Sequence, residues 1–337
     1  MTKFIVRRLS WMILVLLVVS IITFIFMHAV PGGPFTLERP LPPATLEQLQ
    51  IRYGLHLSLP EQYINYMTNL IVPVVTRGRL DPASRSDYLI NFPLPFSDEL
   101  VFRWMDFGPS YKSTTRTVND IFRENLPLSA QLGLQASIFA IALGLPLGVI
   151  AALRRNTFYD YFGMGIAIFG VSIPVIISAP ILQYVIGVQL GWLPLSGWGK
   201  PSQMILPVVT LGFSQSAVIA RVTRASMLQV LNEDFVRTAH AKGLRERQVV
   251  VGHVLKNALI PVVTVIGPML AFLITGSFIV ETIFAIPGMG RFFVVSLFGR
   301  DYSVIMGSIL LLATLVVLAN TLVDVAYAWL DPRIRYY

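Results

Sequence analysis

Long apolar runs separated by short polar connections dominate the pattern along this chain. Because about 20 consecutive apolar residues span the hydrocarbon core of a bilayer as a helix, each such run predicts a transmembrane helix. Six runs meet this length: residues 9–30, 128–153, 161–187, 205–220 with its flanks, 257–280 and 302–323. The pattern therefore predicts an all-α polytopic membrane protein with six transmembrane helices.

The third run is too long for a single straight crossing. No charged residue occurs between residues 161 and 199, and Pro174 and Pro180 interrupt the run. We interpret it as one kinked span followed by an outer loop that contains Trp192 and Trp198, because Trp side chains settle at the membrane surface.

Residues 1–30 are predicted to form a cytoplasmic N-terminus and the first transmembrane helix. A basic start before an apolar run is also typical of a cleaved signal peptide. Here the apolar run is longer than a typical signal core, and the MHAVPGG that follows offers no clear A-x-A cleavage site. We therefore expect a permanent anchor.

Residues 31–127 are predicted to form one extracytoplasmic domain, and residues 128–337 a core of five helices. Within the outer domain, short helices are expected over residues 44–53 and 59–70. The stretch 77–95, which contains Pro82, Asn91, Pro93 and Pro95, predicts a loop. The domain is too small and too poor in apolar residues for a large enzyme, which favours the docking of an outer partner.

Composition supports a membrane protein, since 55% of the residues are hydrophobic, only 13% are charged and the mean hydropathy is +0.68. Soluble domains carry about 25% charged residues. The chain contains no cysteine, which excludes disulfides, thiolate metal sites and a cysteine nucleophile.

The distribution of positive charge predicts the orientation of the chain. The net charge is +8, and the short connections on one side of the membrane hold most of the basic residues. These are Lys3, Arg7, Arg8, Arg154, Arg155, Arg221, Arg224, Arg237, Lys242, Arg245, Arg247, Lys256, Arg333 and Arg335. The opposite short loops hold only Lys200, Arg291 and Arg300. Both termini are therefore expected in the cytoplasm, with the basic residues against anionic lipid rather than nucleic acid.

A charged segment, residues 229–256, lies between the fourth and fifth apolar runs. Asn232 is a predicted N-cap, Glu233 and Asp234 suit the first turn of a helix, and Gly243 can end it in the left-handed conformation. The segment predicts a helix, a tight turn and a second helix that a partner could grip. An ordinary basic cytoplasmic loop is the alternative.

Motifs for catalysis and for cofactor binding are missing from the sequence. It contains no phosphate-binding G-x-x-x-x-G-K-[ST] loop, no H-E-x-x-H zinc helix and no G-x-S-x-G nucleophile elbow. The four histidines (His28, His56, His240 and His253) are spread over both sides of the predicted membrane. We expect no catalytic, metal or cofactor site in this chain.

The middles of the six runs contain no Asp, Glu, Lys, Arg or His. Ion-coupled carriers usually keep such groups within the membrane. Glu281 and Asp324 lie near span ends, where an interfacial or capped carboxylate is expected. Most small and polar residues in the spans are expected to serve helix packing. The candidates to line a translocation path are Ser172, Ser178, Gln183, Ser214, Gln215, Thr275 and Ser277.

Several ordered blocks make the chain resemble the permease subunits of ATP-binding-cassette (ABC) importers of the dipeptide/oligopeptide/nickel class. The blocks include FIVRRLSWMILVLLVVSIITFIFMHAVPGGP, RENLPLSAQLGLQASIFAIALGLPLGVIAALRRN, RVTRASMLQVLNEDFVRTAHAKGL, IVETIFAIPGMGRFF and LVDVAYAWLDPRIR. The resemblance implies a type I ABC importer fold and a subunit of the bacterial inner membrane without catalytic activity. Its implied partners are a homologous second permease, two ATPases that bind ATP and magnesium, and an extracytoplasmic solute-binding protein.

In this family the charged segment holds the EAA motif, whose coupling helix inserts in a groove of the ATPase. The motif's alanine corresponds to Ala239 and its glycine to Gly243, whereas Arg237 replaces its glutamate and Lys256 its later proline. The implied docking residues are Glu233, Asp234, Phe235, Arg237, Ala239, His240, Lys242, Gly243 and Leu244. Phe235 and Ala239 are four residues apart, so we expect them to share the face that enters the partner.

Residues 71–105 look like an insertion relative to the short family form, either a solvated excursion or a landing surface for the binding protein.

Peptides are the expected substrate, although nickel complexes, opines and oligosaccharides use similar permeases. Two other classes stay open. An ion-coupled secondary carrier needs inverted repeats and intramembrane carboxylates, and an intramembrane hydrolase needs a Ser/His or paired-Asp arrangement within the spans.

Overall fold

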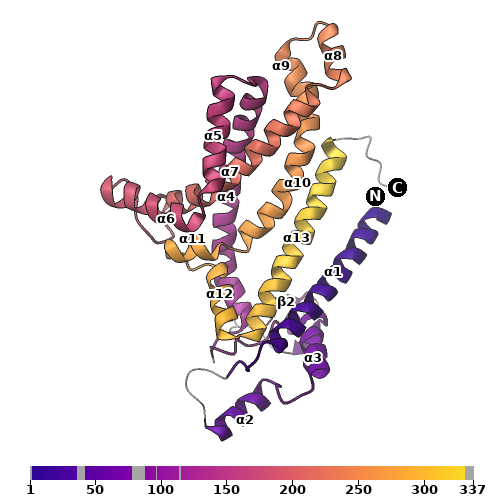
Figure 1. Ribbon diagram of the computed structural model, residues 1–337. Coiled ribbons are helices and arrows are strands. Elements are labelled where there is room, and N and C mark those ends of the chain that lie inside the picture. Colours follow the sequence, from indigo (N-terminus) through magenta and orange to yellow (C-terminus); the bar gives the residue numbers. More distant parts are fainter. Residues whose placement is uncertain (1, 36–41, 78–87, 96, 114, 331–337) are drawn as a thin grey trace. The chain divides into compact units, whose positions relative to one another are not determined.

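The computed structural model describes residues 2–35, 42–77, 88–95, 97–113 and 115–330. The chain divides into two compact units, described separately below. Unit 1 comprises residues 1–13, 128–291 and 314–337, and unit 2 comprises residues 14–127 and 292–313. Helices dominate both units (Figure 1).

Five of the described helices are long and apolar enough to cross a membrane, and a bent pair provides a sixth candidate. These agree with the six predicted runs. The long helices are α1 (Thr2–Ala29), α4 (Val118–Leu153), α7 (Pro201–Val230), α10 (Leu255–Ile274) and α13 (Tyr302–Leu330). Short helices α11 (Phe278–Ile283) and α12 (Met289–Gly299) connect the last two.

The third span is broken rather than kinked. α5 (Phe158–Ser172) and α6 (Val175–Leu182), which continues as the π-helix η1 (Gln183–Gln189), meet at an angle of 103°. Pro174 disfavours helical geometry at the preceding residue, and Ile173 is accordingly extended, with φ −92° and ψ 114°. Pro180 does not interrupt α6, contrary to the prediction, and the wider π-turns follow it.

Glycines on α4 and α7 bring the backbones of unit 1 into direct contact. A Cβ atom added to Gly144 would lie 2.4 Å from the carbonyl oxygen of Ser216, and one added to Gly212 would lie 2.7 Å from that of Ala136. On the α10 side, a Cβ atom on Gly133 would lie 2.3 Å from the carbonyl oxygen of Leu273. These positions accept only glycine, in agreement with the predicted packing role of the small residues.

The main apolar core of unit 1 fills the space around these helices. It contains Leu132, Leu206, Ile219, Val262, Phe284 and Ile286, together with smaller side chains from α4 and α6. The core therefore joins four of the predicted spans with the loop that follows α11.

In unit 2, α2 (Pro43–Arg52) and α3 (Leu59–Ile71) confirm the two short helices predicted between the first and second spans. Ser58 caps α3, because both its backbone N–H and its hydroxyl donate to Glu61 Oε2, over 3.0 and 2.8 Å. The hydrogen bond from the Ser58 hydroxyl is the main cause that holds the pKa of the Glu61 carboxyl below its ordinary value.

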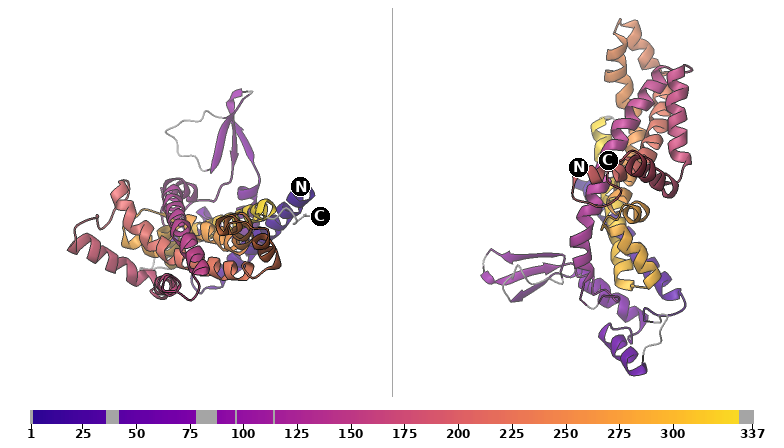
Figure 2. Two further views of the ribbon diagram at one scale, coloured as in Figure 1. Left: turned by 90° about the horizontal axis from the view of Figure 1, so that it is seen from above. Right: turned by 90° about the vertical axis from the view of Figure 1, so that its left-hand side faces the viewer.

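The predicted loop over residues 77–95 is wrong at both of its ends. The antiparallel strands β1 (Val74–Arg77), β2 (Ile90–Leu94) and β3 (Ser97–Trp104) form one sheet in the order β1-β3-β2 (Figure 2). Phe92 pairs with Phe102 across β2 and β3, and their rings stack with centroids 5.0 Å apart. Apolar cross-strand pairs of this kind stabilise a sheet, and Pro93 is tolerated because β2 is an edge strand. Residues 78–87 lie outside the described part.

Candidate functional site

The charged segment forms a helical hairpin within unit 1. It contains α8 (Asp234–Ala241) and α9 (Glu246–Val249), followed by the π-helix η2 (Val250–Val254), which leads into α10. Figure 1 shows α8 and α9 beyond the ends of α7 and α10. The predicted order of helix, turn and helix is therefore present, and it continues directly from two long helices.

α8 begins one residue later than predicted. Glu233 is the N-cap, because its backbone is extended (φ −71°, ψ 148°) and its carbonyl accepts hydrogen bonds from the N–H groups of Val236 and Arg237. Asn232 belongs to the preceding turn, where its Nδ2 donates to the carbonyl of Leu228 over 2.8 Å. An Asn side chain can close the end of one helix as well as the start of the next, and the sequence pattern does not distinguish these roles.

The end of α8 confirms the predicted role of Gly243. Its φ is +75°, in the left-handed region that favours glycine. The N–H of Gly243 donates to the carbonyl of His240 over 2.9 Å, and the N–H of Leu244 donates to that of Ala239 over 3.4 Å. This pair of bonds is a Schellman motif. No atom lies within 4 Å of an added Cβ, so the backbone conformation alone requires glycine here.

The inner face of α8 is packed against the rest of the hairpin. Val236 and Ala239 are buried in a cluster that includes Met227, Val249 and Val254. Only 5% of the Ala239 surface is exposed, and its role in docking stays a prediction. Val236 and Ala239 lie three residues apart on α8, and their burial anchors this helix to α7 and η2.

The outer face of α8 is polar apart from one aromatic ring. Phe235 is 42% exposed, which leaves an aromatic ring within reach of a partner. The other predicted docking residues divide by exposure: Glu233, Asp234, Arg237, His240, Lys242 and Gly243 are exposed, and Leu244 is half-buried. Arg237 and Asp234 form a wholly exposed ion pair at 3.7 Å. Such a pair contributes little, so both groups stay available to a partner.

The predicted path residues come from α5, α6, η1, α7 and the connection after α10. The hydroxyls of Ser178, Ser214 and Thr275 donate to backbone carbonyls of their own helices. Gln183 donates from Nε2 to the carbonyls of Leu195 and Ile283, over 2.7 and 3.1 Å. Ser172 is exposed, and Gln215 and Ser277 are half-buried. The geometry assigns these groups local bonds, and their role along a path stays a prediction.

Glu281 is a polar hub that the sequence did not reveal. Its side chain is fully buried. Oε1 accepts a hydrogen bond from the Ser129 hydroxyl over 2.6 Å, and Oε2 accepts one from the Arg291 N–H over 3.1 Å. The Ser129 oxygen in turn accepts from the N–H of Met289 over 2.7 Å. The only signal for this hub is the glycine-rich PGMG after Glu281, since added Cβ atoms on Gly288 would collide with the carboxylate.

An ion pair joins the start of α5 to α7. Arg224 donates to Asp160 from Nε over 2.6 Å and from Nη2 over 2.7 Å, which is a bidentate arrangement. The Asp160 side chain is buried and that of Arg224 is 28% exposed. Arg8 and Asp324 form a second ion pair within unit 1. Among the described residues, no group of three His, Asp or Glu could hold a metal ion.

Comparison with protein families matches most of the chain. Residues 144–336 match the family described as "Binding-protein-dependent transport system inner membrane component". Residues 1–80 match the family described as "Binding-prot-dependent transport system membrane comp, N-term".

Full-length relatives align from end to end. The chain is 40% identical over 337 residues to the dipeptide transport system permease protein DppB of Bacillus subtilis, covering 100% of this chain and 99% of that protein. It is 41% identical over 338 residues to the oligopeptide transport system permease protein OppB of Salmonella typhimurium, covering 100% of both. Whether residues 71–105 are an insertion relative to shorter family members stays a prediction.

Among solved structures, an inward-facing conformation of the MetNI methionine ABC transporter has a similar fold. The TM-score is 0.52 and the sequence identity 20%, with 63% of this chain and 96% of that chain covered. This likeness concerns the fold alone.

Proposed function

This chain belongs to the inner-membrane components of binding-protein-dependent transport systems, the permease subunits of ABC importers, and from that membership we propose that it carries di- or oligopeptides across the membrane. The chain has the type I ABC importer fold and is a multi-pass protein of the inner membrane. It is a transport subunit rather than an enzyme, and the ATPase is a separate subunit. The peptide cargo is inferred from relatives that are named as dipeptide and oligopeptide permeases.

We further propose that the working transporter pairs this chain with a homologous second permease. Two ATPase subunits would bind ATP and magnesium, and an outer solute-binding protein would deliver the peptide. Both termini and the hairpin would face the cytoplasm, where the exposed Arg155 and Arg221 meet anionic lipid. The outer sheet and helices of unit 2 would then face the binding protein.

The exposed ring of Phe235 on a firmly anchored α8 is the observation that carries this proposal. Buried Val236 and Ala239 hold α8 against α7 and η2, while Phe235, at the edge of that buried face, is 42% exposed with charged residues around it. An aromatic anchor with a polar rim is typical of a docking site. A partner that grips this ring moves α7 and α10 together, because the hairpin is continuous with both.

ATP-driven closure of the ATPase pair would use the hairpin as a lever. The closed pair must bind one arrangement of the permease more tightly than the other, since only differential binding shifts a conformational equilibrium. Transport then follows from alternation between outward and inward openings. The comparisons give no support to the ion-coupled carrier, because the relatives belong to binding-protein-dependent systems.

Cysteine cross-linking tests the docking assignment, because the chain contains no cysteine of its own. Phe235→Cys and the exposed Thr238→Cys are expected to cross-link to an ATPase subunit in the assembled transporter. Gln189→Cys, exposed at the end of η1, is the matched control and should form no such product. Cross-linking from Gln189 but not from Phe235 would refute the assignment.

Uptake of a labelled peptide into vesicles tests the proposed function itself. We expect uptake to require ATP, the ATPase subunits and the binding protein, and Phe235→Asp to abolish it while the protein still inserts. Uptake by this chain alone, driven by a proton gradient, would refute the proposal.

A further inference from the structure

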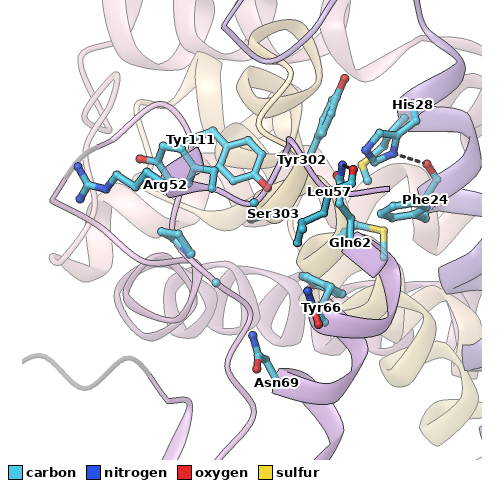
Figure 3. Close-up of a pocket in the computed structure, with 17 residues that line it drawn as sticks. Phe24, His28, Arg52, Leu57, Gln62, Tyr66, Asn69, Tyr111, Tyr302 and Ser303 are labelled. Atoms are coloured by element: carbon cyan, nitrogen blue, oxygen red, sulfur yellow. Dashed lines mark hydrogen bonds between the residues drawn. The ribbon is translucent and has the colours of Figure 1, made fainter. Parts of the chain in front are cut away.

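Unit 2 contains a cavity of about 200 Å³ between the end of α1 and the start of α13. Four separate parts of the chain line it: Phe24 and His28 from α1, residues 52–69 from the end of α2 through α3, Tyr111, and Tyr302 with Ser303 at the start of α13 (Figure 3). Helices and loops from distant parts of the sequence therefore meet around an open space. A tightly packed core would leave no space of this size.

Two buried polar atoms of residues that line this cavity have no hydrogen-bond partner within the described protein. They are the Tyr66 hydroxyl and His28 Nε2. The other ring nitrogen of His28 is bonded to the carbonyl of Phe24 over 2.9 Å, so the ring orientation is set. Buried polar groups are nearly always satisfied in folded proteins, by protein groups or by ordered water. These two atoms therefore need a partner, which an ordered water or a ligand group that displaces it can supply.

Aromatic rings form much of the wall. The rings of His28 and Tyr302 lie 4.9 Å apart, those of Tyr111 and Tyr302 lie 6.1 Å apart, and those of Tyr53 and Tyr111 lie 4.8 Å apart. The four rings follow one another from α1 to the end of α2. Such a wall fits an apolar or aromatic body and disfavours a strongly hydrated ion.

Among the described residues that line the cavity, Arg52 is the one charged residue, and none is Asp or Glu. Its side chain is exposed, with the guanidinium carbon 5.7 Å from the centroid of the Tyr53 ring. Figure 3 shows Arg52 and His28 on opposite sides of Tyr111 and Tyr302. The cavity therefore offers a cation at one end and hydrogen-bonding groups near the other.

We propose that this cavity binds a small organic anion with an apolar or aromatic body, of the size of an amino acid or dipeptide. Its carboxylate pairs with Arg52, its body lies against Tyr111 and Tyr302, and a polar group bonds to Tyr66 and His28. A free amino acid derivative and the C-terminal residue of a short peptide share this chemistry. The inference rests on the cavity alone and does not depend on the proposed transport function.

Binding of N-acetylphenylalanine, compared with N-acetylphenylalaninamide, tests the proposal. The two probes have the same shape and differ in the carboxylate charge. With the full chain in lipid nanodiscs, saturation-transfer NMR should show saturable binding of the acid, about fivefold tighter than the amide. Arg52→Gln should abolish this preference without affecting folding, because Arg52 is exposed. Competition by phenylalanine and by alanylphenylalanine then tells whether the free amino acid or the peptide terminus is accepted.

Tyr66→Phe supplies an independent test, since it removes only the unpartnered hydroxyl. Both probes should bind about fivefold more weakly, as expected for one lost hydrogen bond, while the melting temperature stays equal or rises. Tyr63→Phe is the matched control on the same helix, because the Tyr63 hydroxyl shares a hydrogen bond with Ser20 and does not line the cavity. No saturable binding, equal binding of acid and amide, or unchanged binding by Tyr66→Phe would each overturn the proposal.

Discussion

Ala239 is buried among apolar side chains, so a charged side chain at this position would destabilise the hairpin. We expect Ala239→Asp to unfold the hairpin locally and to abolish uptake, because an unpaired buried carboxylate costs several kcal/mol unless it is neutralised. Membrane insertion should be unaffected, since the spans are unchanged. Gln229→Asp, at an exposed position of α7 outside the docking residues, is the control and should keep most uptake. Uptake assays with membrane immunoblots distinguish these outcomes, and normal uptake by Ala239→Asp would contradict the assignment.

Two substitutions at Gly243 distinguish the effect of its left-handed backbone from the effect of an added side chain. Gly243→Pro should abolish uptake, because proline requires a φ near −65° and cannot donate the hydrogen bond that Gly243 gives to His240. Gly243→Asn should retain part of it, since asparagine tolerates the left-handed region. Space is not limiting for either side chain. Equal uptake by the proline and asparagine variants would show that the left-handed turn is dispensable.

Glu281 organises the loop after α11 through the groups that donate to it. Glu281→Ala would leave the Arg291 N–H and the Ser129 hydroxyl without an acceptor, which we expect to destabilise the fold by about 3 kcal/mol. Thermal unfolding in detergent should show a clear fall in the melting temperature. Glu246→Ala removes an exposed carboxylate and should leave that temperature nearly unchanged. Similar unfolding of both variants would argue against the hub.

At the level of elements, the Asp160–Arg224 pair holds α5 against α7. We expect Asp160→Asn and Arg224→Gln each to lower the free energy of unfolding by about 1–3 kcal/mol, because each leaves a buried or half-buried partner unpaired. A double-mutant cycle measured by denaturation should show coupling between the two positions. The exposed Arg237–Asp234 pair is the control and should show almost none.

The sequence predicted the helices well because each depends on a strong local signal. Apolar runs marked the spans, and Gly243 marked the end of α8. The strands carried a weaker signal, since the prolines and Asn91 of the segment around β2 favour a turn when read alone. The pairing of Phe92 with Phe102, which is a contact across the sheet, decides the outcome. Likewise Pro174 predicts an interruption, but the 103° angle depends on the packing of α6.

The position of the helical hairpin was predicted, but not which side of α8 faces inward. Counting four residues from Phe235 to Ala239 puts both near one side of a helix, yet the burial of Val236 with Ala239 sets which side faces inward. That choice depends on Met227 and Val254, which lie outside α8 and are brought against it by the fold. The hydrogen bonds of Glu281 could not be predicted for a similar reason. Its partner Ser129 is distant in the chain, so only the fold brings the two side chains together.

For the whole molecule, the orientation in the membrane can be tested with single cysteines in a chain that has none. Thr238→Cys should react with a membrane-impermeant maleimide only after the membrane is opened. His56→Cys and Lys200→Cys, both exposed, should react on intact cells. These outcomes follow from the excess of Lys and Arg on the side of the hairpin. Labelling of Thr238→Cys on intact cells would place the hairpin outside and exclude ATPase docking.

The contact between the backbones of α4, α7 and α10 limits how this permease can change shape. Where the glycines meet carbonyl oxygens, no layer of side chains lies between the helices to rearrange. We therefore expect the three helices to rotate as one rigid body during the transport cycle. The hinges must then lie where helical hydrogen bonding is already interrupted, at Ile173 and at Gly276, whose φ is +105°.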